Sequence, residues 1–384
     1  MTTIFDRVPL DQLRRRTSEK WRHYPPDVLP LFVAEMDVPQ SEPVIDAVTD
    51  AMRRGDTGYP SGHGYAEAMA SFAAQRWDWT VDVAGTRTLP DVMTGAVEVL
   101  RLLTGPGDAV VINPPVYPPF TSFVRSADRA VVDAPLGSDG RLDLDALDHA
   151  FGQATTGRRR AAYLLCHPHN PTGTLHTAEE LRAVGELARR HGVRVVADEI
   201  HAPLVVEGPD RFVPTTTQIP DAIALHSASK AFNLAGLRSA VAVPGPDAVA
   251  DLARLPVIVG HGVSHLGAIA QTAAYRECGP WLDELLRGLA QNQQLVSRLL
   301  ADRLPAARWS PPAGTYFAWI DLRAVPAVRA GEDPARLALV RGRVAVSSGP
   351  TFGAQGAGFV RLNLAASTST LTEAVDRLAR GLGG

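Results

Sequence analysis

Short, mainly apolar stretches recur along this chain and constrain its fold more than any other feature. Patterns typical of amphipathic helices lie between several of them. Strands that are apolar throughout and separated by helices are typical of a mostly parallel sheet buried on both faces. The sequence therefore predicts an α/β fold. The apolar stretches are residues 109–112, 161–165, 193–197, 222–225 and 240–243.

One of the predicted helices is marked by local signals at both ends. Thr177 and Glu180 have the spacing of a capping box, in which each side chain bonds the backbone N–H of the other residue. The amphipathic run 180–190 follows and stops at His191-Gly192, where glycine is typical of a helix end. This helix separates two of the predicted strands.

Polar side chains suited to chemistry follow three of the predicted strands. Asn170 lies in a turn fixed by neighbouring proline and glycine, Asp198 ends its strand, and Lys230 follows the strand at 222–225. Ligands of open α/β sheets bind at the carboxyl ends of the strands. We therefore expect these three side chains to share one site.

Lys230 lies in the run Ser227-Ala-Ser229-Lys230, with Arg238 eight positions further on. Such a lysine can form a Schiff base with pyridoxal phosphate (PLP), while the hydroxyls and the arginine hold the phosphate. On its own the run also fits a solvated loop lysine. The two upstream motifs, in the right order, favour the cofactor.

The upstream motifs supply what a PLP ring needs. Asp198 provides a carboxylate that keeps the ring nitrogen protonated. The ring oxygen beside the imine needs a hydrogen-bond donor, and either the amide of Asn170 or the ring of His201 can donate.

Composition excludes several classes of function. The formal net charge of −3 gives no general attraction to nucleic acid or to an anionic membrane. The two cysteines, Cys166 and Cys278, suit a reducing cytosol and cannot form a disulfide framework. We find neither a signal-peptide pattern nor an apolar run of roughly 18 residues, the length that a membrane span needs. We therefore expect a soluble cytoplasmic protein. The group Cys166-His167-x-His169 lacks the spacing of a zinc site, so we expect no metal.

The 384 residues are enough for one large domain or two smaller ones. Residues 281–304 predict one long amphipathic helix that leads out of the large domain. We predict a large PLP-binding domain at residues 45–285. A smaller α+β domain is predicted from residues 1–44 together with 286–384.

These motifs resemble a known family over almost the whole chain, from about residue 5 to the end. The set resembles the fold-type I, PLP-dependent class I/II aminotransferases, with their mostly parallel seven-stranded sheet. Further segments are similar to the narrower MalY/PatB family of cystathionine β-lyase-like cysteine C–S lyases. The wider match is carried by residues 170–173, Asp198, Ser227, Ser229, Lys230 and Arg361, and the narrower match by residues 17–21, 29–37, 58–59, 198–201 and 352–363.

The resemblance implies roles for the residues around the cofactor ring. Lys230 is the Schiff-base lysine and the proton shuttle, and Asp198 pairs with the pyridinium nitrogen. Asn170 and His201 contact the ring oxygen, and Tyr117 stacks on the ring. Ordinary aminotransferases usually carry tyrosine at the position of His201, so this histidine favours the lyase branch.

The resemblance also implies a phosphate site and a substrate site. Gly95-Ala96-Val97 is expected to begin a helix whose N–H groups meet the phosphate. Ser227, Ser229 and Arg238 complete the phosphate site, although Ser229 also fits a role in the turn. Tyr59 is expected to reach the phosphate of the neighbouring subunit, which implies a homodimer with shared active sites. Arg361 is expected to grip the substrate carboxylate with both arms of its guanidinium.

The family suggests β-elimination on cysteine S-conjugates, which yields a thiol, pyruvate and ammonia. The alternative is an aminotransferase, because both reactions begin with removal of the Cα proton by Lys230. A regulatory module without catalysis is disfavoured, since the Schiff-base lysine is present. Phe32, Glu35 and His167 depart from the family pattern and are expected near the substrate entrance, so they leave the identity of the amino-acid substrate open.

Overall fold

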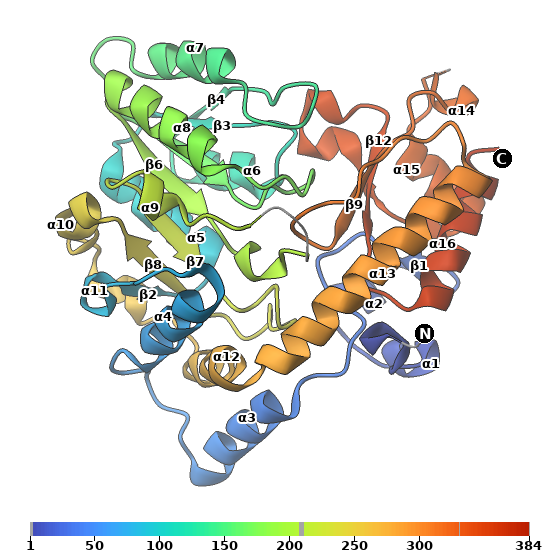
Figure 1. Cartoon of the computed structure of the whole chain (residues 1–384), viewed down its shortest axis with the longest axis horizontal. Coiled ribbons are helices and arrows are strands. Elements are labelled where there is room, and N and C mark those ends of the chain that lie inside the picture. Colours follow the sequence, from blue (N-terminus) through green and yellow to red (C-terminus); the bar gives the residue numbers. More distant parts are fainter. Residues whose placement is uncertain (1–2, 207–210, 330, 384) are drawn as a thin grey trace.

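The computed structural model describes residues 3–206, 211–329 and 331–383 of the chain. Its largest sheet has seven strands in the order β2-β8-β7-β6-β5-β3-β4 (Figure 1). Strand β8 runs antiparallel to both of its neighbours, and the other pairs are parallel. The predicted α/β fold with a mostly parallel sheet is confirmed. The strands are β2 (Arg87–Leu89), β3 (Ala109–Ile112), β4 (Ala130–Asp133), β5 (Ala161–Cys166), β6 (Val193–Asp198), β7 (Ile223–His226) and β8 (Ala240–Pro244).

Alternate residues of one strand enter two different cores, which explains why the inner strands are mainly apolar. In β5, Ala162 and Leu164 pack in a cluster with α5 and α6. Tyr163 and Leu165 pack on the opposite face with α7 and α8. Helices therefore cover both faces of the sheet, and the inner strands β3, β5, β6 and β7 are almost fully shielded from water.

The described helices include the ones that the sequence predicts. Helix α8 has the expected capping box at Thr177 and Glu180, and Gly192 ends it in a left-handed conformation with φ of 69°. The α-helices are α1 (Leu10–Leu13), α2 (Glu19–Arg22), α3 (Glu42–Arg54), α4 (Gly64–Trp77), α5 (Val92–Leu103), α6 (Pro119–Ser126), α7 (Leu144–Ala154), α8 (Ala178–His191), α9 (Thr215–Gln218), α10 (Val249–Leu252), α11 (Val257–Gly260), α12 (His265–Glu277), α13 (Gly279–Arg303), α14 (Pro326–Arg329), α15 (Pro334–Leu337) and α16 (Thr368–Gly381). Short 3-10 turns are Ile4–Asp6, Val83–Gly85, Ala202–Leu204, Pro246–Ala248, Gly349–Phe352 and Ala354–Gly356, and a π-helical turn is Ala338–Gly342.

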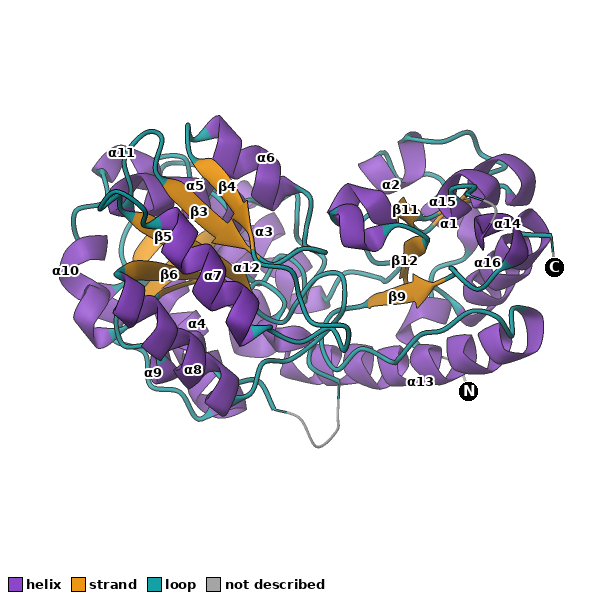
Figure 2. Cartoon of the chain, turned by 90° about the horizontal axis from the view of Figure 1, so that it is seen from above, coloured by secondary structure: helices purple, strands orange, loops and turns teal. Residues whose placement is uncertain are grey.

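A second group of strands forms a separate lobe, seen on the right of Figure 2. Its three-stranded sheet has the order β11-β12-β9, and all its pairs are antiparallel. A parallel pair, β1 with β10, joins residues near the start of the chain to residues near its end. The strands are β1 (Leu29–Pro30), β9 (Phe317–Asp321), β10 (Val344–Ala345), β11 (Ser347–Ser348) and β12 (Phe359–Asn363).

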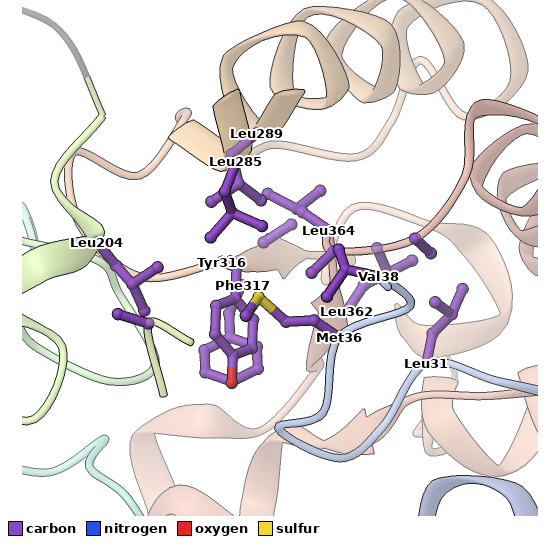
Figure 3. Packing of buried hydrophobic residues seen from close by; sticks show 14 of the residues in the cluster. Leu31, Met36, Val38, Leu204, Leu285, Leu289, Tyr316, Phe317, Leu362 and Leu364 are labelled. Carbon is purple, nitrogen blue, oxygen red and sulfur yellow. The ribbon is translucent and has the colours of Figure 1, made fainter. Parts of the chain in front are cut away.

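Helix α13 starts beside the large lobe and runs along the smaller one (Figure 2). It agrees with the long helix predicted at residues 281–304, which was expected to lead out of the large domain. Leu285 and Leu289 on this helix face a buried cluster that contains Met36, Tyr316 and Phe317 (Figure 3). The predicted division into residues 45–285 and residues 1–44 with 286–384 stays a prediction. Each of its boundaries falls inside a helix, one in α3 and the other in α13.

Asn292 ties α13 to the chain that leaves β12. Its amide donates hydrogen bonds to the carbonyls of Leu364 and Ala366, at 2.8 and 2.9 Å, and its side chain is fully buried. We predict that Asn292→Ala lowers the free energy of unfolding by about 1–3 kcal/mol, because two buried carbonyls lose their donor. Urea unfolding measures this loss.

The matched control is Gln294→Ala, an exposed position on the same helix. We expect that change to stay within about 0.5 kcal/mol of the parent protein. Equal stability of the two variants would contradict the role given to Asn292.

Candidate active site

The three motif residues meet at the carboxyl ends of three adjacent strands, as expected from the sequence. Asn170 follows β5, Asp198 is the last residue of β6, and Lys230 lies four residues beyond β7. The register pairs Cys166 of β5 with Asp198, and Asp198 with Leu225 of β7, so the strands end at nearly the same level. Strand order and register together bring these side chains to one edge of the sheet.

Lys230 lies partly buried at this edge. Burial is the largest cause that lowers the pKa of its amine to about 8, and the nearby charge of Arg361 lowers it further. The carboxylates of Asp198 and Glu35 act in the opposite direction. Within the described part of the chain, no side chain accepts a hydrogen bond from Nζ. The amine is therefore available to a ligand, and an appreciable neutral fraction exists near neutral pH.

Asp198 is buried beside Lys230. Burial raises the pKa of its carboxyl to about 7, against the lowering effects of the Ile200 N–H and of Lys230. The Ile200 N–H donates to Oδ1 at 3.1 Å, which fixes the orientation of the carboxyl. A cation placed against this group would favour its ionised form.

Arg361 on β12 brings a buried guanidinium into the same space. It donates to Asn170 Oδ1 at 2.9 Å and to the Phe32 carbonyl at 3.0 Å. The rings of Phe317 and Phe352 lie 4.0 and 4.9 Å from its central carbon. Burial lowers the pKa of Arg361 to about 10, so the group remains charged at neutral pH. A substrate carboxylate would compensate this buried charge.

The hydrogen bond from Arg361 also decides where the amide of Asn170 points. Because Asn170 Oδ1 accepts from Arg361, its NH₂ group is directed elsewhere and can donate to a ligand. His201 is buried, and its Nδ1 has no hydrogen-bond partner within residues 3–206, 211–329 and 331–383. Burial, Lys230 and Arg361 hold its pKa well below the usual value, so its ring is neutral. Both residues that were predicted to contact the ring oxygen thus keep a polar group free.

Tyr117 lies near the same charged groups. Burial raises the pKa of its hydroxyl, and the nearby Asp198 adds to the shift. Its ring lies 6.2 Å from that of Phe120 in an edge-to-face arrangement. The predicted stacking of Tyr117 on a cofactor ring stays a prediction.

The predicted phosphate site lies at the start of α5 and differs in one respect from the expectation. Helix α5 begins at Val92, not at Gly95, because Asp91 caps it by accepting from the Thr94 N–H. The Gly95 N–H donates to the Asp91 carbonyl at 2.9 Å, so Gly95, Ala96 and Val97 lie within the helix. A β-carbon at Gly95 would lie 2.3 Å from Leu89 Cδ1 of β2, which is too close. A glycine is therefore needed here because α5 packs tightly against β2.

The other predicted phosphate contacts lie in the same region. Arg238 pairs with Asp91 and lies 3.4 Å from Thr94 Oγ1, so it borders the start of α5. The Ser227 hydroxyl is buried and bonds the Ser239 carbonyl at 2.8 Å. We see no hydrogen bond from the Ser229 hydroxyl within the described residues. Ser227 thus has a structural role here, and the phosphate role of this group of residues stays a prediction.

Tyr59 lies apart from these residues on the surface, with 86% of its area exposed. Its ring is 6.5 Å from that of His261. Exposure of this size is compatible with the expected contact to a neighbouring subunit.

The sequence placed Phe32 and Glu35 near the substrate entrance, but the hydrogen bonds that hold their segment in the site were not predicted. Residues 32–36, which we call the strap, connect the two lobes next to Lys230 and Arg361. The Phe32 carbonyl accepts from Arg361, and Asn363 donates to the carbonyls of Val33 and Glu35 at 2.9 and 2.7 Å. Asn233, three residues after Lys230, bonds both the N–H and the carbonyl of Met36, at 2.9 and 3.1 Å.

The sequence does carry signals for some of these contacts. Arg361 and Asn363 alternate along one strand and therefore point to the same face. Asn233 lies three residues after Lys230, but its partner Met36 is 197 positions away, so no local pattern predicts the contact. The Phe317 and Phe352 rings around Arg361 could not be told from ordinary core residues.

The expectation that His167 lies at the substrate entrance is wrong. Its side chain is fully buried, Nε2 lies 3.0 Å from the Val213 carbonyl, and the ring stacks on Phe212 at 4.9 Å. Within the described residues, no group of three or more histidine, cysteine, aspartate or glutamate side chains is arranged to hold a metal ion. Every described helix is too short or too polar to cross a lipid bilayer.

The side chains fit PLP by their chemistry. An amine with a pKa lowered to about 8, a buried carboxyl beside it, and two free donors at Asn170 and His201 match the imine, the ring nitrogen and the ring oxygen. Arg361 Nε is also buried without a hydrogen-bond partner in the described part of the protein, which marks a place for an anion.

Comparison with known proteins agrees with this assignment. The model of the family "Aminotransferase class I and II" matches residues 26–378. A Mycobacterium tuberculosis (strain CDC 1551 / Oshkosh) protein named "Putative cystathionine beta-lyase" is 52% identical, and the match covers 98% of each chain. Cystathionine beta-lyase PatB of Bacillus subtilis (strain 168) is 32% identical, with 93% of each chain covered.

Solved structures give the same result. The crystal structure of a "putative plp-dependent beta-cystathionase" from Corynebacterium diphtheriae matches with a TM-score of 0.90 and 32% identity, over 100% of both chains. The chain therefore belongs to the PLP-dependent class I and II aminotransferase family and, within it, to the MalY- and PatB-like group of cystathionine beta-lyases.

Asp198 provides a test of the electrostatics that does not need the cofactor. Its pKa is raised from 3.8 to about 7 in the folded chain, so the folded state binds the extra proton between these values and stability falls as the pH rises through them. We predict that Asp198→Asn stabilises the cofactor-free protein, by up to about 4 kcal/mol above pH 7 and by less at pH 5.

Urea unfolding of both cofactor-free proteins at pH 5 and pH 8 measures the difference. The asparagine oxygen can still accept from the Ile200 N–H, so the comparison isolates the charge. A gain of the same size at both pH values would contradict the burial argument.

Proposed function

We propose that the protein is a PLP-dependent β-lyase that cleaves the Cβ–S bond of cysteine S-conjugates, cystathionine among them, and yields a thiol, pyruvate and ammonia. The observation that supports this most directly is Lys230, a partly buried amine whose pKa is lowered to about 8 near the charges of Asp198 and Arg361. The names of the similar proteins favour the lyase over the aminotransferase.

We further propose how the side chains hold the cofactor and the substrate. Asp198 pairs with the ring nitrogen of PLP, Asn170 and His201 donate to its ring oxygen, and Tyr117 packs on its ring. The phosphate lies between Arg238, the hydroxyls of Ser227 and Ser229, and the first turns of α5 around Gly95, Ala96 and Val97. Arg361 binds the substrate carboxylate in a bidentate pair.

When it is bound, PLP supplies an electron sink for the charge that develops at the substrate Cα. The residues of the chain supply orientation and proton transfer. Arg361 fixes the carboxylate, which limits how the Cα–H bond can point. Lys230 Nζ then accepts the Cα proton, and its lowered pKa keeps part of the amine neutral for this task. A leaving group on Cβ allows the C–S bond to break, with the electron pair leaving on sulfur.

We also propose a homodimer in which Tyr59 of each chain contacts the phosphate in the other. Tyr59 is exposed, and Val257 and Ile258 of α11 expose 79% and 70% of their areas on the same chain. Large apolar side chains that are this exposed are typical of an interface when they gather in one patch. A cytoplasmic location is proposed as well, because both cysteines are free.

Removal of the amine tests the proposal directly. We predict that Lys230→Ala lowers turnover of L-cystathionine by at least about 1000-fold, because the proton acceptor is lost. Pyruvate and free thiol are measured with and without 2-oxoglutarate. Product formed without the keto acid supports the lyase, whereas amino transfer that requires the keto acid would make the protein an aminotransferase.

Mixed dimers test the shared site. Equal amounts of Tyr59→Ala and Lys230→Ala protein are unfolded together, refolded with PLP and assayed. One site of each mixed dimer then carries native Tyr59 and Lys230, so we predict activity well above the sum of the separately treated variants. No gain over that sum would argue against a Tyr59 contribution from the partner.

A further inference from the structure

The loop at residues 227–239 carries Lys230 near its start and Arg238 near its end. One side of this loop is held by the strap, because Asn233 bonds both the N–H and the carbonyl of Met36. The other side lies against α12, a helix that contributes no side chain to the proposed cofactor and substrate contacts. The contacts that α12 makes with the loop therefore bear on where the reactive amine lies.

The first turns of α12 lie directly on the end of the loop. A β-carbon at Gly267 would be 2.9 Å from the Leu237 carbonyl oxygen and 3.1 Å from that of Arg238, so only glycine allows this close approach of the two backbones. The Ser264 N–H, just before the helix, donates to the Arg238 carbonyl at 3.1 Å. Gln271 follows Gly267 by four residues and therefore lies on the same face of α12, toward the loop.

The side chain of Gln271 is fully buried and contacts both ends of the loop. At the start of the loop, the amide oxygen accepts from the Ala228 N–H at 2.9 Å and from the Ser227 hydroxyl at 3.0 Å. At its end, the NH₂ group donates to the carbonyls of Leu237 and Ser239, at 2.8 and 3.1 Å. A backbone N–H can only donate and a backbone carbonyl can only accept, so these partners fix which way the amide points.

Tyr65 on α4 holds the same amide. Its hydroxyl donates to the Gln271 oxygen at 2.7 Å, and its side chain is buried. Burial raises the pKa of this hydroxyl, so it stays protonated and continues to donate. Gln271 is thus fixed by α4 while it fixes the loop. An amide suits this place because it supplies both an acceptor and two donors.

We propose that Gln271 is a positioning residue that sets where Lys230 Nζ lies relative to Asp198 and Arg238. It acts through the backbone at both ends of the loop and does not touch the reacting atoms. This inference rests on the proposed β-lyase function and adds a residue to it. Without the amide, the loop is free to shift, so the amine is more exposed to water and less well aligned with the Cα proton.

A general contribution to stability is the competing explanation, because a buried amide with several partners stabilises any fold. The two explanations differ in what they predict for the folded variant. A positioning role changes the surroundings of Lys230 and lowers kcat, while KM changes little because Arg361 of the other lobe binds the substrate carboxylate. A loss of stability alone leaves all three as in the parent protein.

The first measurement is the pKa of Lys230 in cofactor-free protein, for the parent and for Gln271→Met, which removes the amide at similar side-chain length. The chain contains only two lysines, so carbon-13 labelling at lysine Cε gives two NMR signals, which Lys230→Ala assigns. We expect the pKa to rise from about 8 toward the ordinary value of 10.5, because burial is the largest cause that lowers it.

Two features make this titration selective. The charged groups that act on the amine, Asp198, Arg361 and Glu35, are all kept in the variant. The second lysine, Lys20, is fully buried and paired with Asp37 at 2.7 Å, so its signal should stay the same and serves as an internal reference.

Steady-state kinetics of the PLP-loaded proteins with L-cystathionine give the second measurement. We expect Gln271→Met to lower kcat at least about tenfold and to change KM less than about twofold. The matched control is Asn292→Ala, which removes a buried amide whose partners, Leu364 and Ala366, follow β12. This control should keep both the pKa of Lys230 and the kcat of the parent.

An unchanged pKa of Lys230 in folded Gln271→Met would overturn the proposal, as would an unchanged kcat or equal changes in Asn292→Ala. Should Gln271→Met fold poorly, Gln271→Asn replaces it, because its amide is one carbon shorter and cannot reach both ends of the loop. The same changes are expected there, and their absence would count equally against the proposal.

Failure of the proposed function is recognised separately, because the titration needs neither cofactor nor substrate. If the parent enzyme releases no thiol from any conjugate, the β-lyase assignment fails. A pKa of Lys230 that rises in Gln271→Met but not in Asn292→Ala would still support the positioning role, and equal pKa values in the parent and Gln271→Met would refute it.

Discussion

The chemistry of this protein depends on charged side chains that are buried at the carboxyl edge of a mostly parallel sheet. Burial of Asp198, Lys230 and Arg361 disfavours the charged form of each group, so each pKa moves toward the value that favours the neutral form. The chain compensates these charges only in part. The remaining compensation has to come from a ligand that carries a cation for Asp198 and an anion for Arg361.

The same burial also affects the neutral polar groups of the site. His201 and Asn170 keep polar atoms free in a buried space, at a cost to the folded protein. Asn170 is oriented by the guanidinium that we assign to the substrate carboxylate. In the proposed site, the Arg361–Asn170 hydrogen bond would therefore couple binding of the cofactor to binding of the substrate.

Much of the large sheet could be predicted because its strands are apolar throughout and its helices carry local end signals. Placement of Asn170, Asp198 and Lys230 at one edge followed from that prediction. Strands β2 and β4 were missed. Strand β2 has only three residues, two of them half-buried, and the four residues of β4 are exposed or only partly buried. The start of α5 was placed three residues too late because the Asp91 cap was not considered. The strap and the aromatic rings around Arg361 depend on contacts between distant segments, which no local pattern reports.

The pairing of β1 with β10 has a consequence for synthesis of the chain on the ribosome. Leu29 pairs with Val344, and the buried side chains of Ile4 and Phe5 pack against Gly288 of α13. Residues 4–30 are thus synthesised well before their partners in α13 and β10. Their apolar side chains lack these partners during that interval, while the large sheet between them can already assemble. The smaller lobe can close only after α13 and β10 have been made, around a segment that was made before them.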